Sequence, residues 1–146
     1  MEPSAVYHQA VAMLARRPFS IRELTRRLLA KGADEASVEQ AIRRCRELGY
    51  LNDADYALNL AKRRLERRGP MAIRAEMRQR GIDEEEAREA LHQAMEGIDL
   101  REEARRILEK RFGETPPADA RERRRRQAFL ARRGFDGTII LELLQD

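Results

Sequence analysis

The chain contains the stretch Leu28-Leu29-Ala30-Lys31-Gly32-Ala33-Asp34, and the same pattern returns at residues 77–83 and 130–136. Every copy has an apolar residue four positions before a glycine, a basic residue just before it and an aspartate two positions after it. The three glycines are 49 and 53 residues apart. Such a long and regular period is typical of a tandem array of small structural units.

Each copy of this pattern predicts a helix, a tight break and a second helix. Glycine closes a helix C-terminus without steric cost, because it can adopt the left-handed backbone conformation. The aspartate then accepts hydrogen bonds from the free backbone N–H groups that begin the next helix. We therefore expect three repeats of three helices, at residues 1–49, 50–98 and 99–146, each with a pair of helices resembling a helix-turn-helix.

Composition favours an all-α fold, and three repeats of three helices give nine helices. Of the 146 residues, 42% are hydrophobic and only 5% aromatic, which fits small cores in a string of modules better than one deep core. Leucine, alanine, glutamate and arginine dominate, and all four are good helix formers. Stretches of alternating β-branched residues, which would predict strands, are missing.

Local signals place several helix boundaries. Ser20 and Glu23 have the spacing of a capping box, so a helix is expected from Ser20 to Gly32. Either Asn52 or Asp53 caps the helix that ends before Gly69. Apolar rows at helical spacing predict the buried positions, and Leu48 and Leu141 are among the residues expected to point inward.

The residue inventory holds no catalytic or metal-binding pattern. Cys45 lies in an apolar row and is expected to be a buried small hydrophobe, while His8 and His92 lie off the apolar stripes. One cysteine and two scattered histidines cannot form a zinc site. We expect a protein without catalytic residues, metal or cofactor.

The same inventory predicts the compartment. One cysteine excludes an internal disulfide framework and fits a reducing environment. The N-terminal region lacks a long apolar run, so neither a signal peptide nor a membrane span is expected. The sequence thus predicts a cytoplasmic protein.

Clusters of basic residues are the remaining candidates for function. The chain has 30 basic and 26 acidic residues, and the net charge of +4 is spread along it. Arginine faces attract phosphates or carboxylates through bidentate hydrogen bonds. We take as candidate partner-binding or nucleic-acid-binding residues Lys62, Arg63, Arg64, Arg67 and Arg68, then Arg121, Arg123, Arg124, Arg125, Arg126, Arg132 and Arg133, and lastly Arg26, Arg27 and Lys31. The alternative is an ordinary solvated face, and Glu122 is placed to pair with Arg126 at i+4.

Several blocks of the sequence match a known pattern. They are Pro18-Phe19-Ser20 with Glu23-Leu24, Gly49-Tyr50-Leu51-Asn52-Asp53 with Tyr56-Ala57, Gly69-Pro70 with Arg80-Gly81-Ile82, and Phe129-Leu130-Ala131-Arg132-Arg133-Gly134-Phe135. In these blocks the chain closely resembles the RecX family of bacterial recombination regulators, over nearly its whole length. Met77 stands where leucine is usual, which is a nearly volume-conserving exchange.

The resemblance implies three tandem three-helix repeats in an elongated, curved molecule. It also implies a modulator, usually an inhibitor, of the RecA recombinase, with no active site of its own. Members of the family are understood to lie in the helical groove of the RecA filament on DNA, and many bind DNA. The expected partner is thus the RecA filament, with single- or double-stranded DNA as a further one, and we expect a monomer.

A DNA-binding regulator of transcription is the alternative, because helix-turn-helix-like pairs also occur there. A recognition helix needs basic or amide side chains that reach base edges. The helix that starts at Asp83 opens with four acids, and the one that starts at Asp136 has no basic residue. Only Arg43, Arg44 and Arg46, in the helix expected at 34–48, fit this alternative.

Overall fold

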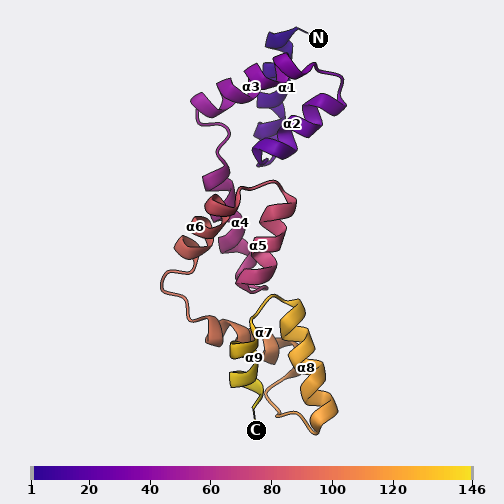
Figure 1. Ribbon diagram of the computed structural model, residues 1–146, viewed down its shortest axis with the longest axis vertical. Helices are drawn as coiled ribbons and strands as arrows, with labels where there is room; N and C mark the ends of the chain where they lie inside the picture. Colours follow the sequence, from indigo (N-terminus) through magenta and orange to yellow (C-terminus); the bar gives the residue numbers. More distant parts are fainter. Residues whose placement is uncertain (1, 146) are drawn as a thin grey trace. The chain divides into compact units, whose positions relative to one another are not determined.

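The computed structural model describes residues 2–145, and these residues form nine α-helices and no β-strand (Figure 1). The helices are α1 (Pro3–Arg16), α2 (Ile21–Ala30), α3 (Glu35–Glu47), α4 (Asp53–Arg64), α5 (Pro70–Gln79), α6 (Glu84–Ala94), α7 (Leu100–Phe112), α8 (Ala120–Arg132) and α9 (Gly137–Leu144). The three copies of the repeated stretch join α2 to α3, α5 to α6 and α8 to α9. The predicted all-α class is therefore confirmed.

Aspartate side chains begin the second helix of each pair, as the repeated stretch predicts. The carboxylates of Asp34 and Asp136 each accept a hydrogen bond from the backbone N–H three residues on, at 3.1 and 3.0 Å. Asp83 accepts from the N–H two residues on, at 3.1 Å. Hydrogen bonds from Ser37 also lower the pKa of the Asp34 carboxyl below its usual range.

The predicted capping box is present at the start of α2. The Ser20 hydroxyl accepts from the Glu23 N–H at 3.1 Å, and the Glu23 carboxylate accepts from the Ser20 N–H at 2.9 Å. At the start of α4, Asn52 is the cap, because its side-chain oxygen accepts from the N–H three residues on at 3.1 Å. Asp53 has another role, since its carboxylate accepts from the N–H of Ile21, the first residue of α2, at 2.9 Å.

The described residues divide into two compact units, 2–57 with 77–87 and 58–76 with 88–145. The core of the first unit is built mainly from α1, α2 and α3, with Val6, Leu24, Leu28, Val38, Ile42 and Cys45 buried. The core of the second is built mainly from α7, α8 and α9, with Ala104, Ile107, Phe129, Leu130, Ile140 and Leu144 buried. The middle repeat contributes to both units, and the repeat boundaries after residues 49 and 98 stay a prediction.

Two predicted core positions are wrong. Leu48 is 50% exposed and Leu141 is 54% exposed. Leu48 lies just past the end of α3, where the chain leaves the helical path that carries Cys45 inward. Leu141 is the immediate neighbour of the buried Ile140, and adjacent residues on a helix point about 100° apart. The expected burial of Cys45 is confirmed.

The turn between α5 and α6 lies against the start of α2 within the first unit. The Ser20 hydroxyl donates a hydrogen bond to the carbonyl of Arg80 at 2.6 Å. The guanidinium of Arg22 donates to the carbonyl of Arg78 at 3.3 Å. Carbonyl groups at and just after the end of α5, which have no partner inside their own helix, thereby find one in the preceding repeat.

The turn between α8 and α9 lies against the start of α5 in the same way, within the second unit. The N–H of Gly69 donates to the carbonyl of Arg133 at 2.6 Å, and the N–H of Met71 donates to the carbonyl of Gly134 at 3.1 Å. In both units, therefore, the glycine turn of one repeat contacts the first residues of the second helix of the repeat before it.

Candidate interaction surfaces

The basic residues at the end of α4 and in the turn after it differ in their contacts. Arg64 donates through Nε and Nη2 to the two carboxylate oxygens of Glu76, at 2.9 and 3.0 Å, and Arg68 donates to the same carboxylate at 3.3 Å. Glu76 is mostly buried, so these contacts fasten the end of α4 to α5. Arg68 is nevertheless exposed, as are the other candidates in this segment, Lys62, Arg63 and Arg67.

Arg126 lies inside the protein, in contrast to the expected exposed arginine face. Its side chain donates to the carbonyl of Thr115 at 2.7 Å and to the Glu122 carboxylate at 3.3 Å, and the residue is only 8% exposed. The predicted pairing with Glu122 is thus confirmed. Because Arg126 holds the loop before α8 in place, its guanidinium is not available to a partner at the surface.

The other candidates on α8 and α2 lie at or near the surface. Arg121, Arg124, Arg125 and Arg132 are exposed, while Arg123 and Arg133 are half-buried. On α2, the residues Arg26 and Arg27 are exposed, and so is Lys31 just after the helix. Arg125 lies 3.4 Å from the carboxylate of Glu122, an exposed pair of small energetic weight. The exposed residues stay candidates for binding.

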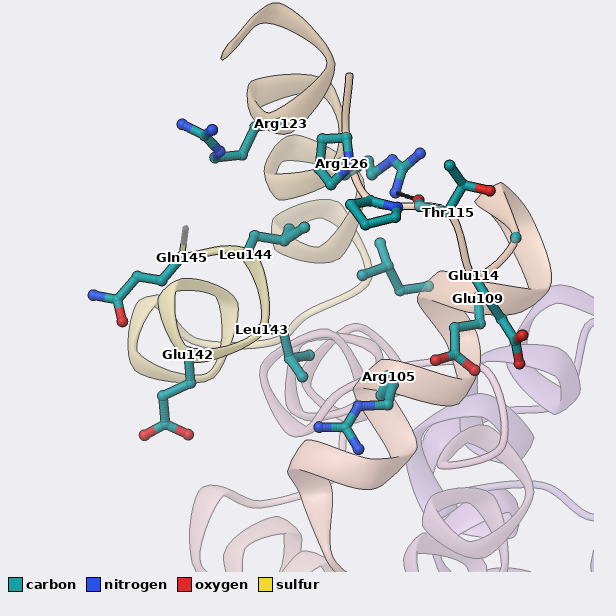
Figure 2. A pocket seen from close by; sticks show the side chains of 14 residues that line it. Arg105, Glu109, Glu114, Thr115, Arg123, Arg126, Glu142, Leu143, Leu144 and Gln145 are labelled. Atoms are coloured by element: carbon teal, nitrogen blue, oxygen red, sulfur yellow. Dashed lines mark hydrogen bonds between the residues drawn. The ribbon is translucent and has the colours of Figure 1, made fainter. Parts of the chain in front are cut away.

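A pocket of about 420 Å³ lies beside the loop between α7 and α8 (Figure 2). The figure shows the Arg126 guanidinium pointing to the Thr115 carbonyl at its edge. The charged side chains around the pocket are balanced, since three basic residues meet three acidic ones: Arg105, Arg123 and Arg126 with Glu109, Glu114 and Glu142. A balanced lining gives no preference for a charged ligand of either sign.

A second hollow of about 410 Å³, which we call the basic groove, lies in the second unit where α4 ends and α7 and α8 pass. Two apolar residues, Ile107 and Phe129, and one acid, Glu66, take part in its lining. The rest of the lining is basic and consists of Arg67, Arg106, Lys110, Arg111 and Arg133. The groove therefore has a strongly positive charge.

Two of these arginines bind the turn that follows α4. Arg106 donates from Nη2 to the carbonyl of Glu66 at 2.9 Å, and Arg133 donates from Nη1 to the carbonyl of Arg67 at 3.1 Å. Backbone carbonyls in a turn after a helix have no partner in a regular helix or sheet, and here the two arginine side chains supply one. The same hydrogen bonds fix the positions of both guanidinium groups at the groove.

Arg106, Lys110 and Arg111 line the groove but are not among the candidates predicted from the sequence. In the sequence, Ile107, Leu108 and Glu109 separate Arg106 from the pair Lys110-Arg111, so the three form no continuous basic run. Their one local signal is spacing, because Arg106 and Lys110 are four apart and share a helix face. The neighbours that complete the groove, Arg67 and Arg133, come from distant parts of the chain.

Among residues 2–145, no helix is both long and apolar enough to cross a membrane. In the same range, no three histidine, cysteine, aspartate or glutamate side chains gather as metal ligands would. Burial raises the pKa of the Cys45 thiol, which disfavours the reactive thiolate.

The fold and its surfaces define a tandem three-helix repeat protein that presents charged surfaces. Three family models match along the chain: the first RecX three-helix domain at residues 7–45, the second at 52–91 and the third at 99–144. The chain therefore belongs to the RecX family. The predicted three three-helix repeats and the family resemblance are both confirmed.

Relatives and solved structures agree with this assignment. The regulatory protein RecX of Stenotrophomonas maltophilia strain R551-3 is 41% identical over 133 residues, which cover 90% of this chain and 80% of the relative. That of Acidithiobacillus ferrooxidans strain ATCC 53993 / BNL-5-31 is 38% identical over 144 residues, which cover 98% and 89%. The crystal structure of RecX from Lactobacillus salivarius has the same fold, with a TM-score of 0.83 at 21% identity over 98% of this chain and 94% of that one.

Proposed function

We propose that this chain binds the RecA recombinase filament on DNA and lowers its ATP hydrolysis and strand exchange. The observation that carries the proposal is the match to all three RecX domains along the chain. Its relatives at 38–41% identity are named regulatory proteins, in keeping with a role in control rather than catalysis. The proposal includes a cytoplasmic monomer that acts without a cofactor.

Exposed arginine and lysine side chains supply the binding surface in this proposal. Arg121, Arg124 and Arg125 are exposed on α8, and Lys62 and Arg63 are exposed on α4. Arrays of repeats offer long surfaces to extended partners. Arginine binds the carboxylates of a protein and the phosphates of DNA with the same planar geometry. A filament of protein on DNA presents both groups.

The test is the DNA-stimulated ATP hydrolysis of RecA on single-stranded DNA, with the chain added in increasing sub-stoichiometric amounts. We expect a dose-dependent fall at levels too low to cover the DNA. The double variant Arg124→Glu, Arg125→Glu should inhibit less, because it reverses two exposed charges and leaves the buried Arg126 in place. If that variant inhibits as well as the parent while its circular dichroism is unchanged, the α8 surface does not bind the filament.

Direct binding to DNA is the second candidate, and the exposure of Arg43, Arg44 and Arg46 on α3 favours it. Binding to the same DNA without RecA is the measurement that separates the two. The matched variant Arg43→Glu, Arg46→Glu carries the same change of charge as the α8 variant. Tight binding to bare DNA that this variant abolishes, together with unchanged RecA hydrolysis, would favour the second candidate.

A further inference from the structure

We propose that the basic groove binds a short acidic peptide segment in which an apolar side chain lies next to carboxylates. The proposal deepens the proposed function and rests on it for one point only, namely that the segment belongs to the RecA filament. The test of peptide binding itself uses no RecA. The groove lies wholly within the second compact unit, so its geometry depends on one set of packed helices.

The positive charge of the groove favours an anionic ligand. Five basic side chains line it, against the single acid Glu66. Arg67, Lys110 and Arg111 are exposed, and none of them forms an ion pair with an acidic side chain within residues 2–145. Three unpaired cations around one hollow repel one another, so a bound carboxylate would be stabilised by all of them.

The remaining two cations are already held in position. Arg106 donates to the Glu66 carbonyl and, at 2.7 Å, to the carboxylate of Glu103. Arg133 donates to the Arg67 carbonyl through one nitrogen. A guanidinium has five N–H donors, so each of these arginines keeps donors for a ligand. Because their positions are fixed before binding, a ligand orders fewer side chains, and this lowers the entropic cost of binding.

The apolar part of the lining favours a ligand that also carries an apolar side chain. Ile107 and Phe129 are buried and contribute to it. The ring of Phe129 packs edge-on against Phe112, with the ring centres 5.3 Å apart, so it is held firmly. An apolar side chain of a ligand would find contact here, whereas a simple anion would not. A peptide with one aromatic or aliphatic residue among acids meets both requirements.

The geometry favours a peptide over a nucleic-acid strand. The guanidinium of Arg133 lies over the Phe129 ring, 5.0 Å from its centre, and so occupies a face on which a base would stack. Nucleic acids also present phosphates in an extended row, which suits a long basic stripe. The groove is a local hollow of about 410 Å³, a size that accepts a few side chains.

The experiment measures fluorescence anisotropy of a labelled short peptide of glutamates and aspartates with one central phenylalanine, added to the full chain. The double variant Lys110→Glu, Arg111→Glu reverses two exposed charges that form no ion pair within residues 2–145, although the Arg111 guanidinium also lies over the Phe112 ring, 5.0 Å from its centre. The matched control is Arg121→Glu, Arg124→Glu, which makes the same change of charge on exposed residues of α8. A second peptide replaces the phenylalanine with serine, and circular dichroism checks the fold of each variant.

We expect the parent to bind the phenylalanine peptide and the groove variant to bind it about tenfold more weakly, which corresponds to about 1.4 kcal/mol from two reversed ion pairs. The control should stay within about twofold of the parent, and the serine peptide should bind more weakly than the phenylalanine peptide. Equal losses in the groove variant and the control would overturn the proposal, since binding would then reflect overall charge. The proposal would also be overturned, in favour of nucleic acid, if the parent binds no peptide but binds single-stranded DNA, and the groove variant does not bind that DNA.

Inhibition of RecA tests the proposed function, whereas peptide binding tests the groove proposal. If the peptide binds in the groove but the chain leaves RecA hydrolysis unchanged, the groove proposal stands and the proposed function fails. If the chain inhibits RecA and no peptide binds, the proposed function stands and the groove proposal fails.

Discussion

Replacing Gly134 with alanine should destabilise the protein much more than replacing Gly32, although both glycines have left-handed backbones, with φ angles of +96° and +99°. A Cβ atom at residue 134 would lie 2.5 Å from the Cβ of Ala72 and would also overlap the Ala72 backbone nitrogen. A Cβ atom at residue 32 would meet nothing within 4 Å. The first variant therefore adds steric overlap to backbone strain, while the second carries strain alone.

The two contributions can be assigned separate magnitudes. A left-handed backbone costs an L-residue about 1–2 kcal/mol, which is the loss of unfolding free energy that we expect for Gly32→Ala. Overpacking a filled contact costs a further 1–3 kcal/mol or so, which brings the expected loss for Gly134→Ala to about 2–5 kcal/mol. Gly69→Ala supplies the overlap alone, because its Cβ would lie 2.5 Å from the carbonyl oxygen of Gly134 and its φ angle is not left-handed.

Urea unfolding followed by circular dichroism measures all three losses, and the slope of free energy against urea shows whether the variants unfold from the same compact state. The expected order of stability is parent, then Gly32→Ala or Gly69→Ala, then Gly134→Ala. Equal losses for Gly134→Ala and Gly32→Ala would refute the reasoning. They would mean that the turn between α8 and α9 does not press against the start of α5.

Two further predictions concern buried polar groups. Burial raises the pKa of the Asp53 carboxyl, so the folded protein holds the carboxyl proton more tightly than the unfolded chain does. The contribution of Asp53 to stability therefore falls as the pH rises from 3.8, the value of the free carboxyl, through the higher pKa of the folded state. Asp53→Asn keeps an oxygen that accepts from the Ile21 N–H and removes the charge. The free energy of unfolding of this variant should therefore fall less than that of the parent as the pH rises through this range, and an unchanged or steeper fall would contradict the prediction. Arg126→Ala should lower the free energy of unfolding by about 1.5–3 kcal/mol, because it removes the hydrogen bonds of a buried cation. Arg125 is its exposed neighbour, and Arg125→Ala should lower the same quantity by at most about 0.5 kcal/mol. Similar losses for the two variants in urea unfolding would show that Arg126 does not hold the loop before α8.

Much of the local structure was predictable from sequence, because it depends on contacts between residues close along the chain. The caps at Ser20, Asp34 and Asp136 each act over three residues, and the glycine breaks act within one turn. Apolar spacing likewise predicted most buried positions. The errors at Leu48 and Leu141 arose where a residue lies past a helix end or beside a better-placed neighbour.

The candidate surfaces were predictable only in part. Counting basic residues identified Arg64 and Arg126 as candidates, but a count cannot tell an exposed arginine from one that is bound inside the protein. Glu76 binds the first from 12 residues away, and the carbonyl of Thr115 accepts from the second at a separation of 11. Neither contact leaves a periodic signal in the sequence.

By itself, the sequence determined the family, the all-α class, the three copies of the glycine turn and most helix starts, because each of these is encoded in neighbouring residues. Only the tertiary structure decided where those turns dock, which arginines remain available and how the basic groove is assembled. Arg67 and Arg133 are 66 residues apart, yet one donates to the carbonyl of the other. Contacts over such distances depend on how helices pack, and packing joins residues that no local pattern relates.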